Sequence, residues 1–374
     1  MDQNKHESQM EGRRTFTLPA QVIFCIVILL FSFISALNPL GLVGLPTAIL
    51  AAAMTAMLAL SWQSSRAKLL FLVLLSVIPF AAATVYHGSL SLALAALFPL
   101  AMALPIFLTV RMGMGRAASI AGAAIGGMVV WLAYFALAIT AEYGACNAET
   151  IGQMLDTALT PVKEMLSQLT FESEKGVMPY YNAEDIELLL YYTKTLLLGV
   201  LAAMMLVNAY FVTLAARLIS GIFDVETLLP MSLRISMRAT MTEDGPKLDI
   251  SRELVPWRIE IDSVTAGVFI AAYVVSLLLS FMGDGALTLY SALQNLVVIL
   301  APGFLYSGAR DILLSLRGRA SFGGLSKFAL IFDAVLIFIN PSSAVTLISA
   351  LGVIVTLREN RLRRHSETNT EGKE

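Results

Sequence analysis

Repeated apolar runs of about twenty residues are the feature that most restricts how this chain can fold. An α-helix rises 1.5 Å per residue, so about 20 apolar residues cross the roughly 30 Å hydrocarbon core of a bilayer. Eight runs near that length are bounded by charged or turn residues: 18–37, 41–61, 69–85, 90–110, 117–140, 195–218, 263–283 and 286–308. The sequence therefore predicts an all-α, polytopic bundle of transmembrane helices.

Composition supports the same fold class. Hydrophobic residues make up 57% of the 374 residues and charged residues only 14%. That is too little polar surface to cover a water-soluble globule of this length. Lipid is therefore expected to solvate most of the chain.

A longer apolar stretch closes the chain. Residues 328–357 would extend about 45 Å as one helix, which is too long for one ordinary crossing. Asn340-Pro341 divides this stretch into two short segments. We expect either a closing hairpin, which brings the total to ten crossings, or a re-entrant pair.

The distribution of basic residues gives an orientation. With ten crossings and the N-terminus inside, all of the 25 Lys and Arg residues except Lys163, Lys175 and Lys194 fall on the inner side. This is the asymmetry expected of the positive-inside rule. The sequence thus predicts a multi-pass protein of the cell membrane with both termini in the cytoplasm.

The spans divide the chain into seven parts. They are a disordered cytoplasmic tail (1–17), the first five helices (18–140), an acidic extracytoplasmic loop (141–194), the sixth helix (195–218), a cytoplasmic loop (219–262), the C-terminal transmembrane helices (263–357) and a basic, then polar, cytoplasmic tail (358–374).

The acidic loop contains apolar residues at helical spacing: Ile151, Leu155, Leu159, Val162, Leu166 and Leu169. This spacing predicts one or two amphipathic helices, with Thr160-Pro161 suited to the start of a second one. Two interpretations remain open. The segment is either an interfacial helix that packs on the bundle or a lid over a binding site.

Small residues form stripes along two of the spans. Gly44, Ala48, Ala52 and Ala56 repeat every four residues in the second span, and Gly122 and Gly126 do so in the fifth. Such stripes allow helix backbones to approach closely in lipid. They indicate either packing within this chain or a docking face for another membrane subunit.

Asp333 is a carboxylate within the closing apolar stretch, roughly 9 Å into the hydrocarbon if helical spacing is counted from Lys327. An unpaired ionised carboxylate at that depth is expensive, so it should face the bundle and find a partner, or stay protonated. Asn208, at a similar depth, and Asn295, beside Gln294, are the candidate partners. The alternatives are a structural or snorkelling group, and a polar site for a solute, ion or proton.

Other chemical signals are weak. The two cysteines and three histidines are scattered and predict no metal site. No cofactor motif stands in a suitable context, and no basic patch indicates nucleic acid. We therefore expect no cofactor, no nucleic-acid partner and no enzymatic activity.

Four segments carry a family resemblance: "LLLGVLAAMMLVNAYFVTLAARLI", "LVPWRIEIDSVTAGVF", "NLVVILAPGFLYSGARDILLSL" and "FINPSSAVTLISALGVIVTLREN". In these segments and in the order of its helices, the chain resembles the YybS-like family of bacterial membrane proteins, a domain of unknown function, over about residues 15–360. That resemblance implies a multi-pass membrane protein and supplies no substrate or catalytic residue.

The helical region is also similar to the substrate-binding subunits of energy-coupling-factor transporters. This second resemblance implies that Ala48, Ala52 and Ala56 dock onto a partner.

Two functions follow as hypotheses. The first is a subunit that binds or transports a small molecule together with a partner, using Asp333, Asn208, Asn295 and Gln294 as the polar groups of a cavity. The second is a structural or regulatory protein of the cell envelope that works through contacts made by its loops.

Overall fold

The chain forms two compact units that share one long helix. The computed structural model describes residues 17–37, 43–62, 65–112, 114, 116–173, 176–179, 181–223, 233–242, 245–254, 261–282, 286–316 and 341–371. One unit comprises Met1–Cys146 and Met205–Arg258, and the other comprises Asn147–Met204 and Ile259–Glu374. The boundary at Met204 falls inside helix α9 (Ala183–Phe223).

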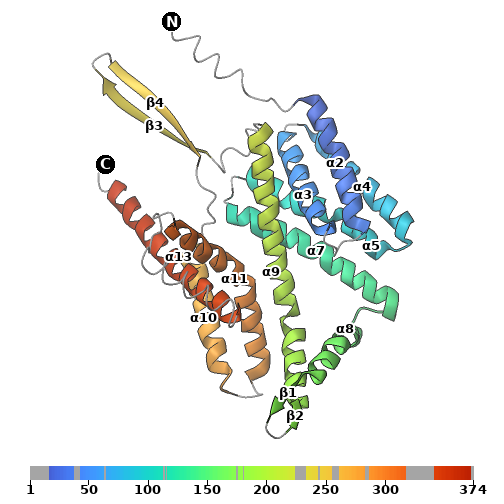
Figure 1. Cartoon of the computed structure of the whole chain (residues 1–374). Helices are drawn as coiled ribbons and strands as arrows, with labels where there is room; N and C mark the ends of the chain where they lie inside the picture. The colour runs from blue at the N-terminus through green and yellow to red at the C-terminus, as the bar shows by residue number, and fades with distance from the viewer. Residues whose placement is uncertain are drawn as a thin grey trace. The chain divides into compact units, whose positions relative to one another are not determined.

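The first unit is mainly helical (Figure 1). Besides the second half of α9, its helices are α2 (Leu18–Leu37), α3 (Gly44–Ser61), α4 (Arg66–His87), α5 (Leu90–Leu94), the 3₁₀ turn η1 (Ala95–Leu97), α6 (Phe98–Arg111) and α7 (Arg116–Tyr143). Helix α3 packs against both α2 and α6 and is buried on nearly every side. Its sequence is rich in alanine, which lets neighbouring backbones approach closely.

Proline interrupts one predicted span and leaves others continuous. The predicted run 90–110 is split into α5, η1 and α6, with Pro99 in the first turn of α6. Proline fits that position because the first backbone N–H groups of a helix have no intrahelical acceptor. Pro79 and Pro105 lie inside α4 and α6, and both helices continue past them.

The ends of α2 and α4 are tied together. His87 Nε2 lies 3.0 Å from the Ala36 carbonyl oxygen near the end of α2. In the tautomer that carries its proton on Nε2, His87 donates to a carbonyl that has no partner within its own helix. Gly88 then ends α4 with a φ of 61°, a left-handed conformation that glycine adopts without strain.

The second unit contains α8 (Ala148–Gln168), a short hairpin of β1 (Thr170–Ser173) and β2 (Gly176–Pro179), the first half of α9, α10 (Ser263–Leu279), α11 (Leu287–Leu316) and α13 (Pro341–Glu371). Helix α13 begins at Pro341, where the sequence predicts a break. Residues 328–340, the first half of the predicted closing pair, lie outside the described residues. Helix α13 continues through residues 358–371, where the sequence predicts a separate polar tail.

The start of α10 is held by two polar contacts. The Asp262 carboxylate accepts a hydrogen bond from the Thr265 N–H at 2.9 Å and so caps the helix. Hydrogen bonds from the Thr265 side chain and backbone hold the pKa of the Asp262 carboxyl below its usual value. Asn360 Nδ2 donates to the Ile261 carbonyl at 2.8 Å, which ties α13 to the residue that precedes this cap.

Helices α11 and α13 approach each other most closely at two glycines, and side chains such as Ile312 and Leu351 pack beside this crossing. A Cβ placed on Gly352 would lie 1.9 Å from the Phe304 carbonyl oxygen, and one on Gly308 would lie 2.1 Å from the Ile348 carbonyl oxygen. Only glycine fits at these two positions. The crossing of α11 and α13 is therefore a contact between backbones.

Seven helices in the described part of the chain are long and apolar enough to cross a membrane: Leu18–Leu37, Gly44–Ser61, Arg66–His87, Leu90–Arg111, Arg116–Tyr143, Ala183–Ile219 and Leu287–Leu314. Ser263–Leu279, where the sequence predicts a further span, is a shorter apolar helix. The fold is an all-α bundle and the chain is a multi-pass membrane protein. The predicted fold class is confirmed.

Both predicted loops contain structure that differs from the prediction. Helix α8 is one continuous helix with Pro161 inside it, so no second helix begins at Thr160-Pro161. The sixth helix runs over Ala183–Phe223 rather than 195–218. Two antiparallel hairpins were not foreseen: β1–β2, and the longer pair of β3 (Leu233–Thr242) and β4 (Gly245–Leu254).

The α11–α13 crossing gives a direct test of the packing. We expect Gly352→Ala to destabilise the protein by at least about 1–3 kcal/mol, because the added Cβ must push two backbones apart. Thermal unfolding in detergent measures the change. Gly267→Ala is the matched control, since a Cβ on this α10 residue would have no atom within 4 Å. Equal stability of the two variants would contradict the close backbone contact.

Candidate functional site

Asn295 on α11 joins that helix to α9. Its Oδ1 accepts a hydrogen bond from the Gly199 N–H at 2.7 Å, and its Nδ2 donates to the Thr195 carbonyl at 2.7 Å. Thr195 and Gly199 are four residues apart, so their carbonyl and N–H are the two groups that pair with each other in an undisturbed helix. The Asn295 side chain thus contacts both members of one backbone pair in α9.

This arrangement occupies the Asn295 amide and requires glycine opposite it. Nδ2 also donates to the Ser291 carbonyl at 2.8 Å. A Cβ on Gly199 would lie 2.5 Å from Asn295 Oδ1. The neighbouring Gln294, another predicted site residue, donates from Nε2 to Ser276 Oγ on α10 at 3.0 Å. In this structure, both amides connect helices of the second unit.

Asn208, the third predicted amide, differs from these two. It lies on α9 in the first unit, is only 6% exposed, and its Nδ2 has no hydrogen-bond partner among the described residues. It shares a buried face of the helix with Met205, Ala209, Val212, Thr213 and Ala216. A buried donor without an acceptor lowers stability by about 1–3 kcal/mol. Asn208 is therefore the predicted polar residue with unused hydrogen-bonding capacity.

Asp333 lies outside the described residues. A different buried carboxylate, Asp311 on α11, was missed by the sequence analysis and is only 2% exposed. It was missed because the predicted span ended at Gly308, whereas α11 continues to Leu316. The adjacent Arg310 lies 3.5 Å from Glu359 of α13, so this end of the α11–α13 pair carries charged groups.

The predicted small-residue stripes are buried or in close contact within the chain. Gly44, Ala48, Ala52 and Ala56 are buried in the first unit. A Cβ on Gly126 would lie 2.0 Å from the Ala101 carbonyl oxygen, and one on Gly122 would lie 3.1 Å from Pro105 Cβ. Packing of α3, α6 and α7 uses these surfaces. The stripe on α3 is not available as a docking face.

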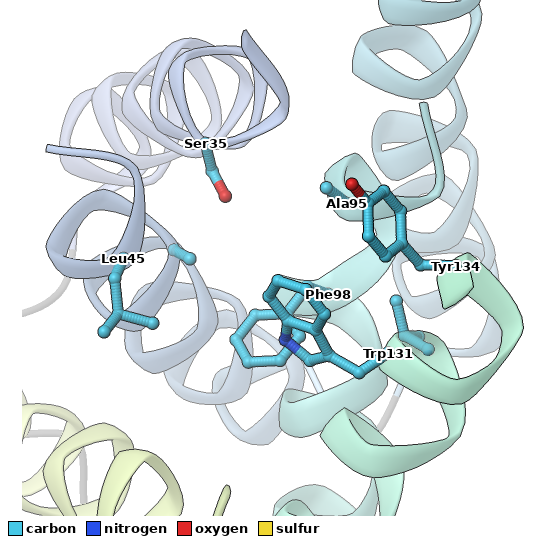
Figure 2. A pocket seen from close by; sticks show the side chains of 8 residues that line it. Ser35, Leu45, Ala95, Phe98, Trp131 and Tyr134 are labelled. Carbon is cyan, nitrogen blue, oxygen red and sulfur yellow. The ribbon is translucent and has the colours of Figure 1, made fainter. Parts of the chain in front are cut away.

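An apolar pocket lies among the helices of the first unit (Figure 2). It is lined by residues of α2, α3, η1, α6 and α7: Ser35, Leu45, Ala48, Ala95, Phe98, Val130, Trp131 and Tyr134. Trp131 and Tyr134 are in edge-to-face contact, with ring centroids 5.3 Å apart. The cavity volume is about 20 Å³, which is room for a group the size of a water molecule.

Three polar groups border this pocket: the Ser35 hydroxyl, the Trp131 indole N–H and the Tyr134 hydroxyl. Figure 2 shows the Ser35 hydroxyl pointing into the space between the helices. No hydrogen bond joins any of the three to a residue in the described part of the chain, but the fully buried side-chain atoms without a partner there are Asn208 Nδ2 and Ser291 Oγ, not these three. An apolar pocket with a few polar groups at its edge is the usual form of a small-molecule site.

The fold and these sites define a class: a multi-pass α-helical membrane protein with a small apolar pocket. Comparison with family models, curated proteins and solved structures gave no match.

The Asn295 contacts can be tested by a change of one atom. Asn295→Asp keeps an acceptor for Gly199 N–H but loses the donor to the Thr195 carbonyl, which cannot become a donor itself. We expect a loss of about 1–3 kcal/mol in unfolding free energy. Gln294→Glu is the control and should lose less, because the Ser276 hydroxyl, which donates to the Tyr273 carbonyl at 2.8 Å, can donate to the new carboxylate instead. A smaller loss for Asn295→Asp than for Gln294→Glu would contradict this assignment.

Replacing Asn208 should raise the unfolding free energy, whereas replacing Asn295 should lower it. Asn208→Leu removes an unpartnered buried amide while keeping a similar volume, so unfolding in detergent should require about 1–3 kcal/mol more. The same substitution at the partnered amide, Asn295→Leu, should lower stability. Destabilisation by both substitutions would show that Asn208 is a satisfied structural group.

Proposed function

We propose that this chain is a membrane subunit that binds a small, mainly apolar molecule in the pocket of the first unit. The observation that carries the proposal is the set of three unpartnered polar groups, from Ser35, Trp131 and Tyr134, around an otherwise apolar space. None of the three is a fully buried atom without a partner, so each keeps accessible surface that a bound group could reach. A ligand with a hydrogen-bonding end would supply the missing partners.

The size of the pocket limits what it accommodates. Its volume of about 20 Å³ is far below the roughly 300–1,000 Å³ of sites that enclose a drug-sized molecule. The pocket as it stands would hold one end of a ligand, with the rest of the ligand between the helices or in the bilayer. Asn208, a buried donor in the same unit, is a second group that a ligand acceptor could engage.

The finer assignments are part of the same proposal. We place the protein in the bacterial cell membrane with both termini in the cytoplasm, on the distribution of Lys and Arg. We retain the proposed membership of the YybS-like family, on the four segments quoted above, and a non-enzymatic role. A partner membrane subunit stays in the proposal, with a docking surface other than the buried stripe on α3.

A second function, a structural or regulatory envelope protein, has its own supporting observation. The β3–β4 pair extends over ten residues in each strand and pairs with no other described strand. The outer edges of such a ribbon carry backbone groups that can add a strand from another protein. This function would work through that loop and would not need the pocket.

Occupancy of the pocket distinguishes the two functions. We expect native mass spectrometry of protein purified from its own membranes to detect a bound small molecule. Its retention should fall about two- to tenfold in Ser35→Ala and in Tyr134→Phe, the loss of one hydrogen bond in each case.

The controls change the same residue types elsewhere in the first unit. Ser76→Ala removes a hydroxyl that donates to the Leu72 carbonyl within α4, and Tyr86→Phe alters an exposed ring. Both should retain the molecule. If all four variants retain it equally, or if no molecule is bound, the pocket is not the site and the second function is favoured.

A further inference from the structure

Helix α8 has one apolar and one polar face. Asn147 caps it, accepting from the Thr150 N–H at 2.9 Å, and it then runs without a break over 21 residues. Helical spacing places Ile151, Leu155, Val162, Met165, Leu166 and Leu169 on one side. Gln153, Asp156, Thr160, Lys163 and Ser167 occupy the opposite side.

The polar face of α8 is directed toward the first turns of α9, beside which α8 lies (Figure 1). Lys194 of α9 pairs with Asp156, and Glu187 lies 4.0 Å from Lys163. As residue numbers rise along α8, the partners fall along α9, so the two helices run in opposite directions. On the apolar face, Leu155, Leu159 and Leu166 are half-buried, whereas Ile151, Val162 and Met165 are exposed, so one edge of this face is covered and the other is open.

No residue of α8 is buried. On its apolar face Ile151 is 38% exposed, Val162 39% and Met165 57%. Isolated exposed apolar residues are ordinary, but a continuous helical stripe of them requires an apolar neighbour. Within the described part of the chain, protein covers this stripe only in part.

The position of α8 along the chain indicates what that neighbour is. Lys194, which pairs with Asp156, is the last charged residue before the uncharged stretch 195–216 of α9. The first residue of α8 follows the last residue of the membrane-crossing helix α7 after only four residues. The Lys194–Asp156 pair and the four-residue link to α7 both place α8 near the depth where the chain leaves the hydrocarbon.

We propose that the first half of the apolar face of α8, which includes Ile151, binds the lipid bilayer at the boundary between headgroups and acyl chains. This inference is independent of the pocket and of any ligand. An amphipathic helix buries its apolar face in this layer, and its polar face stays in water or against protein. The ion pairs to α9 fix which face is turned to the lipid.

The ion pairs also predict that α8 is tilted relative to the membrane surface. Glu187 is seven residues farther from the membrane-crossing part of α9 than Lys194, about 10 Å along a helix. The partner of Glu187, Lys163, lies in the second half of α8, so this half rises away from the acyl chains. Ile151 should lie deeper in the lipid than Met165.

The charge of α8 identifies the type of lipid contact. The helix carries three carboxylates, from Glu149, Asp156 and Glu164, against one Lys, Lys163. Basic helices bind anionic headgroups through their charge, whereas this one has no such attraction. Its contact with the bilayer is apolar and should not depend on anionic lipid.

Depth-dependent fluorescence quenching in the full-length protein tests the proposal. Single cysteines are placed at Ile151, Gln153 or Met165 in a Cys25→Ala, Cys146→Ser background, labelled with an environment-sensitive fluorophore and reconstituted into phosphatidylcholine vesicles with brominated acyl chains. Ile151→Cys and Gln153→Cys are matched, because they lie two residues apart on opposite faces. We expect quenching at Ile151 to exceed that at Gln153 at least twofold, and quenching at Met165 to be intermediate.

Two outcomes would overturn the proposal. Equal quenching at Ile151 and Gln153 would show that the apolar face is not in lipid. Protection of Ile151 from both the brominated lipid and aqueous iodide would show that protein, from this chain or a second copy, covers the face. Circular dichroism and size-exclusion profiles that match the unlabelled protein verify the fold, and replacing part of the phosphatidylcholine with phosphatidylglycerol should leave the quenching ratio unchanged.

Discussion

Close approach of helix backbones is the constraint on which this structure depends. Lipid gives helices no hydrophobic reason to associate, so van der Waals contact between well-fitted surfaces must hold them together. In the first unit, α3 supplies an alanine-rich surface, and Gly126 brings α7 against the Ala101 carbonyl of α6. In the second unit, Gly308 and Gly352 do the same for α11 and α13. Neighbouring helices of the same unit cover these small residues, so the stripe on α3 is used for packing within the chain.

Some polar groups in the bundle have hydrogen-bond partners on a neighbouring helix and others have none. The first kind has a structural role, and the second kind is a candidate for binding a ligand. The amides of Asn295 and Gln294 connect helices and have partners. The Asn208 amide donor and the polar groups around the pocket have none in the described part of the chain. Asn208 and Asn295 are the same residue type in apolar helices, so their sequence contexts do not separate them. Only the neighbouring helix decides which amide is satisfied.

The sequence was sufficient for the fold class and insufficient for the sites. The apolar runs predicted the helices because crossing a bilayer requires length and hydropathy, which are local properties. The extension of α9 to Ala183 was missed, since an amphipathic continuation lengthens a helix beyond its apolar run. The β3–β4 hairpin left a signal that could have been used: apolar and polar residues alternate in "LRISMRATMT", just before a turn. The pocket left none, because its residues come from five elements.

The pocket and the buried face of α9 belong to one packing arrangement within the first unit. Phe98, which lines the pocket, and Met205 of α9 both lie against Gly127, where an added Cβ would be 3.1 Å from Phe98 Cε2 and 3.2 Å from Met205 Sδ. Asn208 follows Met205 by three residues and therefore occupies the same side of α9 one turn farther along. Phe98, Met102 and Met205 thus form one apolar contact around Gly127, which includes a residue of the pocket and a residue one turn from Asn208. A close-packed core resists local change, so a ligand that displaced Phe98 would also disturb the packing beside Asn208.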